Sequence, residues 1–117
     1  MWNIVYYKKR DGTIPVKEFI EALPVRHRAK AVREITLLEE YGNRLTEPHA
    51  KHIEGKLWEL RIKSSSDISR IFYFLHSGDD IILLHGFVKK TQKTPRREIN
   101  RASEYLDDYL RRFPDGF

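Results

Sequence analysis

At 117 residues, the chain is long enough for one folded domain with a buried core and too short for two, so we expect a single domain over residues 1–117. Its 40% hydrophobic and 12% aromatic residues argue against disorder, and the absence of cysteine excludes disulfides and thiolate chemistry. A formal net charge of +5 makes a polyanion, most commonly nucleic acid, the first partner to consider.

The first part of the chain predicts a strand and two helices. Residues 2–7 are rich in aromatic and β-branched side chains, as strands are, and a polar turn follows them. Pro15 suits the first turn of a helix, and Pro24 precedes a second helix. The apolar stripe of the second helix consists of Val25, Ala29, Val32, Ile35 and Leu38. We expect the two helices to form a hairpin.

The middle of the chain predicts a loop and then three strands. Residues 43–56 show little periodicity, so we expect a surface loop there. Residues 57–63 alternate between two faces, which puts Arg61 on the more polar face of a half-buried strand. Residues 68–75 and 81–88 are strand-like and follow tight turns, so the three strands should form two consecutive hairpins.

A final helix is expected with Thr94 as its cap and Pro95 in its first position. Its apolar stripe consists of Ile99, Ala102, Leu106, Tyr109, Leu110 and Phe113. The order β-α-α-β-β-β-α predicts an α+β fold with a mostly antiparallel sheet, helices on one face and the other face partly open. Arg61 and Arg70 would project from neighbouring strands onto that open face.

The positive charge is concentrated in one segment. Residues 89–101 contain six basic residues and one acidic residue, which leaves 16 residues of each sign in the rest of the chain. The basic residues are Lys89, Lys90, Lys93, Arg96, Arg97 and Arg101. Arginine presents a fixed fork of donors that matches phosphate oxygens, and a lysine crowded by other cations can have a lowered pKa. The segment therefore favours contact with a polyanion.

Three stretches of sequence carry a resemblance to a known family: LWELR at 57–61, SRIFYF at 69–74, and LLHGFVKKTQKTP at 83–95. With them, the chain resembles the RelE/HigB superfamily of toxins from type II toxin-antitoxin modules, and more narrowly its phage-derived HigB-like branch. The similarity covers most of the chain, including its N-terminal strand and helices. It implies a RelE-like fold and a ribosome-dependent endoribonuclease that cuts messenger RNA and is neutralised by an antitoxin.

The resemblance also implies site residues. Arg70 matches the strand arginine of the family, Arg61 matches the arginine of its LR pair, and Lys89 or Lys90 matches the basic residue after the last strand. The candidates for a tyrosine or histidine near the scissile phosphate are Tyr73, His85 and Tyr105. From the charge pattern we expect RNA contacts from Lys93, Arg96, Arg97 and Arg101. The antitoxin would cover the basic face or lie along the helical hairpin, and if it lays a helix along the hairpin its contacts are Val25, Val32 and Ile35.

Cleavage in such a family proceeds by attack of the ribose 2′-OH on the adjacent phosphodiester, so we expect no metal site and no cofactor. The expected partners are messenger RNA, the ribosome and an antitoxin, the last in a hetero-oligomer. Neither a signal-peptide pattern nor a long apolar run is present, so we expect a cytoplasmic location without membrane contact.

Other interpretations stay open. The protein could be a non-catalytic inhibitor of DNA gyrase like the ParE toxins, or a plain RNA-binding module. Arg61 and Arg70 could also form ordinary ion pairs with Glu59 or Asp67.

Overall fold

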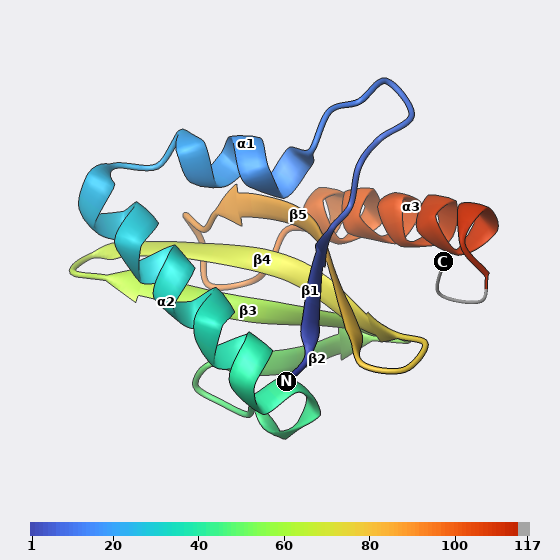
Figure 1. Ribbon diagram of the computed structural model, residues 1–117. Helices are drawn as coiled ribbons and strands as arrows, with labels where there is room; N and C mark the ends of the chain where they lie inside the picture. Colours follow the sequence, from blue (N-terminus) through green and yellow to red (C-terminus); the bar gives the residue numbers. More distant parts are fainter. Residues whose placement is uncertain (115–117) are drawn as a thin grey trace.

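The computed structural model describes residues 1–114, which form one small α+β domain with a five-stranded sheet and three α-helices (Figure 1). The strands are β1 (Asn3–Tyr6), β2 (Ala50–Glu54), β3 (Leu57–Ser64), β4 (Asp67–His76) and β5 (Asp80–Val88). The helices are α1 (Pro15–Glu21), α2 (Val25–Tyr41) and α3 (Arg96–Arg112), with a short 3-10 turn η1 (Gly42–Arg44) after α2. None of these helices is both long and apolar enough to span a membrane.

The strand order across the sheet is β1-β5-β4-β3-β2. The two predicted hairpins are confirmed, because β3 pairs with β4 and β4 with β5 in antiparallel register. β1 lies parallel to β5 at the other edge, so the sheet is mixed. The chain reaches β5 only after both helices and three other strands, and this long-range pairing leaves no local signal in the sequence.

The predicted surface loop over residues 43–56 is wrong in part, because it contains β2, and the predicted order therefore lacks one strand. β2 is an edge strand that pairs antiparallel with β3 and has an irregular register between His52 and Glu54. Only Ala50 of this strand is buried. An edge strand with mostly polar side chains produces little hydrophobic alternation, so the sequence pattern did not reveal it.

Helices cover both faces of the sheet, so the prediction of helices on one face is wrong. Side chains of α1 and α2 pack in one apolar cluster with Leu60, Ile62 and Ile71 of the sheet. On the opposite face, α3 packs in a second cluster that includes Phe72 and Phe74 (Figure 1). α3 packs mainly on β5 and β4. Part of the same sheet face, toward β3 and β2, is therefore not covered by a helix.

The predicted stripe on α2 has the wrong register. The buried side chains are His27, Ala31, Glu34, Ile35 and Leu38, whereas Val25, Ala29 and Val32 are exposed. The two buried polar residues are hydrogen-bonded: the His27 ring nitrogens lie 2.6 Å and 2.8 Å from the hydroxyls of Ser64 and Ser69, and Glu34 Oε1 lies 2.7 Å from His49 Nδ1. The other carboxylate oxygen of Glu34 has no partner among the described residues. Polar groups can be buried when they are hydrogen-bonded. The buried face of α2 therefore includes His27 and Glu34 and differs from the face that the apolar pattern predicts.

Candidate functional site

Two arginines lie directly opposite one another in the centre of the sheet. Arg61 of β3 and Arg70 of β4 are cross-strand partners in the antiparallel register. Their neighbours Leu60, Ile62 and Ile71 face the cluster under α1 and α2, so strand alternation turns both arginines to the other face. Like charges directly opposite are unfavourable, so this pair needs a compensating group.

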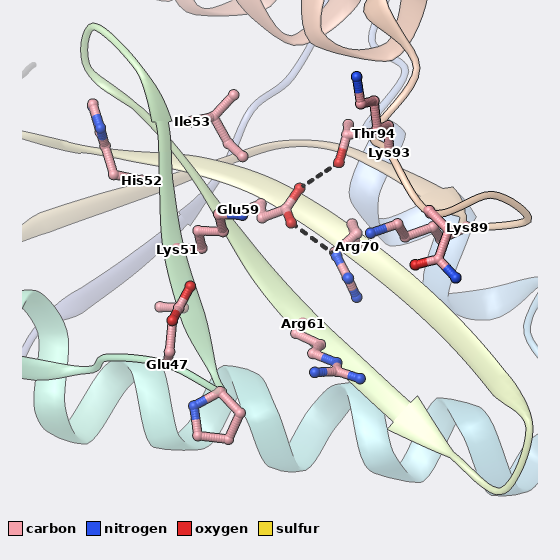
Figure 2. A pocket seen from close by; sticks show the side chains of 13 residues that line it. Glu47, Lys51, His52, Ile53, Glu59, Arg61, Arg70, Lys89, Lys93 and Thr94 are labelled. Atoms are coloured by element: carbon pink, nitrogen blue, oxygen red, sulfur yellow. Dashed lines mark hydrogen bonds and ion pairs between the residues drawn. The ribbon is translucent and has the colours of Figure 1, made fainter.

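Glu59 supplies that compensation. Arg70 Nε donates a hydrogen bond to Glu59 Oε1 at 2.8 Å, and Thr94 Oγ1 donates to Glu59 Oε2 at 3.2 Å (Figure 2). Glu59 and Arg70 are only 5% and 7% exposed. The predicted role of Thr94 as a helix cap is therefore wrong: its hydroxyl is directed to the sheet, and Pro95 occupies the capping position of α3 without a side-chain hydrogen bond.

The arginines line a cavity of about 570 Å³. It extends from β2 across β3 and β4 to the segment that precedes α3 (Figure 2). Its charged lining residues are Glu47, Lys51, Glu59, Arg61, Arg70, Lys89 and Lys93. A second cavity of about 550 Å³ adjoins the first, since both are lined by Arg61, Arg70, Lys89 and Gln92, and Lys90 lines the second only. The three cationic residues that line both cavities, Arg61, Arg70 and Lys89, thus form a ridge between them.

Both arginines carry buried donors that the protein does not use. Arg61 Nε and Arg70 Nη1 each expose less than 1 Å² to solvent and have no hydrogen-bond partner among residues 1–114. Buried polar groups are normally paired, and each unpaired donor costs about 1–3 kcal/mol. An anion held between the arginines in the cavity would satisfy both donors, and phosphate has the oxygen geometry that guanidinium groups match.

Lys89 follows β5 and reaches toward Arg70 (Figure 2). Partial burial lowers the pKa of its amine, and the neighbouring charges of Arg70, Lys51 and Arg61 lower it further, while Glu59 raises it. A lysine with a lowered pKa gives up its proton more readily than an exposed one. The arrangement therefore combines fixed phosphate donors with one cation suited to proton transfer.

The remaining basic residues of the 89–101 segment divide into two groups. Lys93 lines the first cavity and Lys90 the second. Arg96 forms two hydrogen bonds with the exposed carboxylate of Glu54, at 2.7 Å and 3.1 Å. Arg97 and Arg101 are exposed on α3. The two lysines thus lie with the arginine pair, and the three arginines form an outer surface on the first turns of α3.

The structure does not bring Tyr73, His85 or Tyr105 to the cavities. Tyr73 is buried on the opposite face of the sheet, in the cluster under α1 and α2, where burial raises the pKa of its hydroxyl. His85 lies beneath α3 with Nε2 2.7 Å from Glu98 Oε1, and burial lowers its pKa. Tyr105 stacks on Tyr7 at a ring separation of 4.8 Å. None of the three lines either cavity.

Three charged residues of the first cavity were not proposed as site residues from the sequence. Glu47 and Lys51 belong to the segment predicted as a loop, and nothing in its pattern marked them. Glu59 was considered only as an ion-pair partner of Arg61 or Arg70, and its ion pair with Arg70 is present in the structure. Because Glu59 and Arg61 are two positions apart on one strand, alternation puts both on the same face. Together the three add two carboxylates and one cation to the predicted set.

The predicted antitoxin contacts differ in accessibility. Val25 is 76% exposed and Val32 is 52% exposed, so both present apolar surface on α2. Ile35 is only 9% exposed and belongs to the cluster between α2 and the sheet. Ile35 is therefore a core residue and cannot contact a partner without local unfolding.

Comparison with known proteins identifies the family. Residues 18–107 match the family described as phage derived protein Gp49-like (DUF891). A comparison with curated proteins found no match. The Gp49-like family lies within the RelE/HigB-like toxin superfamily and is associated with toxin-antitoxin systems. Because the match spans most of the chain, from α1 to the last turns of α3, the protein belongs to the phage-derived Gp49-like family.

Proposed function

We propose that this protein is the toxin of a type II toxin-antitoxin module, of the HigB-like branch, and that it cleaves messenger RNA on the ribosome without a metal. The observation that carries the proposal is the pair of buried, unpartnered donors, Arg61 Nε and Arg70 Nη1, beside Lys89 at the ridge between two cavities. Membership of a family associated with such toxins supports it.

The arginine pair stabilises the charge that develops on the scissile phosphate. As the ribose 2′-OH attacks, negative charge accumulates on the non-bridging oxygens. Arg61 and Arg70 bind those oxygens with desolvated donors, and Glu59 already fixes the guanidinium of Arg70, which makes electrostatic stabilisation strong. Lys89 donates a proton to the leaving 5′ oxygen, a role that its lowered pKa favours.

Attack by the 2′-OH also needs a proton acceptor. Two carboxylates, Glu47 and Glu59, line the first cavity. Both oxygens of Glu59 already accept hydrogen bonds, from Arg70 and Thr94. Glu47 is exposed and lies on the β2 side of the cavity, away from Lys89 (Figure 2). We assign the acceptor role to Glu47, so that base and acid stand on opposite sides of the bound phosphate.

Exposed cations around the cavities and on α3 bind the RNA strand on either side of the cleaved bond. Lys90, Lys93, Arg97 and Arg101 are exposed along the segment that leads into α3. Such contacts release counterions, so binding weakens as salt increases. Arg96 contributes less, because its guanidinium is held by Glu54.

The antitoxin covers the exposed side of α2. Val25, Ala29 and Val32 form an apolar strip there, and residues 25–33 contain four Lys or Arg residues and no acidic residue. An acidic amphipathic helix would complement both features. Val25→Asp/Val32→Asp should weaken binding of the purified antitoxin at least about tenfold, since apolar contacts at the centre of an interface carry much of the affinity. Unchanged affinity by calorimetry would place the antitoxin elsewhere.

The proposed activity is tested in a purified translation system, with primer extension on a defined messenger RNA with and without ribosomes. We expect new 5′ ends only when ribosomes are present, and a 2′,3′-cyclic phosphate at the 3′ end of each upstream fragment because the 2′-OH is the nucleophile. Chelation of divalent metals cannot be applied to intact ribosomes, so the terminus chemistry is the test of the metal-free route. Growth arrest without new 5′ ends, accompanied by inhibited DNA gyrase, would contradict the proposal.

A further inference from the structure

Glu59 is a buried acid at the centre of a cationic site, and its contacts define what it does there. We infer that Glu59 is a positioning residue for RNA cleavage: it fixes the guanidinium of Arg70 and anchors the basic segment before α3, so that a phosphate meets donors already in place. This inference rests on the proposed function of the cavity, and it assigns to Glu59 a task different from proton transfer.

The first contact fixes Arg70. The carboxylate accepts a hydrogen bond from Arg70 Nε at 2.8 Å, and both side chains are almost completely buried. Since a guanidinium is planar, holding its Nε edge determines the direction of its other nitrogens. Nη1 remains buried and without a partner among the described residues, on a side chain that lines the cavity. Glu59 therefore leaves one Arg70 donor for a ligand and prevents that donor from turning away.

The second contact fixes the basic segment. The other Glu59 oxygen accepts a hydrogen bond from Thr94 Oγ1 at 3.2 Å, across 35 positions of sequence. Thr94 stands between Lys93 and Pro95, where the segment from Lys89 enters α3. Lys89 is tied to β4 at its other end, through its backbone N–H to Ile68 O at 2.8 Å. Glu59 thus holds the distal end of the segment that carries Lys89 and Lys93.

Glu59 also sets the charge around Lys89. The groups that act on the Lys89 amine come from every neighbouring strand: Lys51 on β2, Glu59 and Arg61 on β3, and Arg70 on β4. Glu59 is the one acidic group among them, and it opposes the lowering of the Lys89 pKa. Its removal should lower that pKa further, which a merely structural residue would not do.

The experiment compares wild type with Glu59→Gln and Glu59→Ala, and uses Glu104→Gln as the matched control because Glu104 is exposed on α3 outside both cavities. Each variant is first checked for folding by circular dichroism. The kcat and KM for ribosome-dependent cleavage are then measured across a pH series. In the ribosome-free protein, solvent exchange of the Arg70 Nε proton is measured by NMR, with inorganic phosphate as the anionic probe.

The amide of Glu59→Gln still accepts from Arg70, so we expect kcat within a few-fold of wild type and a protected Arg70 Nε proton. The limb of the pH profile that reports Lys89 should move to lower pH. Glu59→Ala should lose about 100-fold in kcat with little change in KM, as when one fixed transition-state donor is lost, and its Arg70 Nε proton should exchange rapidly. Glu104→Gln should match wild type.

Three results would overturn the inference. Equal loss of kcat in Glu59→Gln and Glu59→Ala would make Glu59 the proton acceptor. An unshifted pH profile in a folded Glu59→Gln protein would make Glu59 a structural residue. If Glu59→Ala does not fold, the pH profile of Glu59→Gln alone tests the inference. A protected Arg70 Nε proton in a folded Glu59→Ala would show that Glu59 does not hold the guanidinium. If wild type itself cuts no RNA, the proposed function fails, whereas the NMR comparison still reports whether Glu59 fixes Arg70.

Discussion

A buried ion pair and a ligand site share the same arginine in this protein. Glu59 neutralises Arg70 through Nε, while Nη1 has no partner within residues 1–114. A buried pair often adds little net stability, because the desolvation of two charges offsets their attraction. The arrangement is therefore better explained by ligand binding than by stability, because it keeps available a desolvated donor whose direction is fixed.

His85 is the residue whose titration should be visible in folding. Burial lowers its pKa below the usual 6.5, although Glu98 opposes the shift. The unfolded chain then binds the proton more readily than the folded protein, so the contribution of His85 is complete above pH 6.5 and is lost as the pH falls through that value. His85→Gln retains a hydrogen-bonding group but does not titrate.

Urea unfolding at several pH values between about 8 and 5 should therefore show a shallower loss of stability in His85→Gln than in wild type. The difference in unfolding free energy between the two proteins should change in favour of the variant as the solution becomes more acidic. A difference that stays constant over this range would mean that the imidazole titrates alike in the folded and unfolded states.

At the scale of the elements, strand alternation was the most reliable guide to the site. The pattern of residues 57–63 put Arg61 on the more polar face of its strand. In the structure that is the face turned away from α1 and α2, where Arg61 lies opposite Arg70. Alternation works because adjacent side chains of a strand must point to opposite faces. The same rule places Tyr73 on the face covered by α1 and α2, since Arg70 and Tyr73 are three positions apart.

The helices were less predictable than the strands. α1 begins at Pro15 as expected, and Ile99, Ala102, Leu106 and Tyr109 are the buried residues of α3. In α2, however, the buried positions include His27 and Glu34, whose partners lie 37 and 15 residues away. Hydrogen bonds to distant residues leave no trace in a local apolar pattern, so neither these positions nor the exposure of Val25 and Val32 could be predicted.

The contact between α1 and β5 gives a test of the packing. A Cβ atom added at Gly86 would overlap the ring of Phe19. Because protein cores are close-packed, Gly86→Ala should destabilise the fold by about 1–3 kcal/mol in urea unfolding. Phe19→Leu should recover part of this loss in the double variant, since a smaller side chain makes room. Additive effects of the two substitutions would contradict the described contact.

At the scale of the whole molecule, the site exists because the helices do not cover the sheet completely. α1 and α2 lie on the first face and α3 on the second, over β5 and β4 (Figure 1). The part of this face that α3 leaves uncovered carries the two cavities, the first lined from β2, β3 and β4 and the second from β3, β4 and the segment after β5. The +5 net charge comes from the segment that borders them. A charged concave surface of this kind concentrates a polyanionic substrate.

The most direct measurement of the central claim is the rate of ribosome-dependent messenger RNA cleavage by Arg70→Lys. This variant keeps a positive charge beside Glu59, so the ion pair survives, but it loses the planar fork and the Nη1 donor. The matched control is Arg44→Lys, at an exposed position of η1 outside both cavities.

We predict that primer extension will show cutting at least about 100-fold slower with Arg70→Lys than with wild type, the loss expected when one transition-state donor is removed. Arg44→Lys should cut at the wild-type rate. Wild-type cutting by a folded Arg70→Lys protein would contradict the account, because the cation ridge between the two cavities would then not be where the RNA is cleaved.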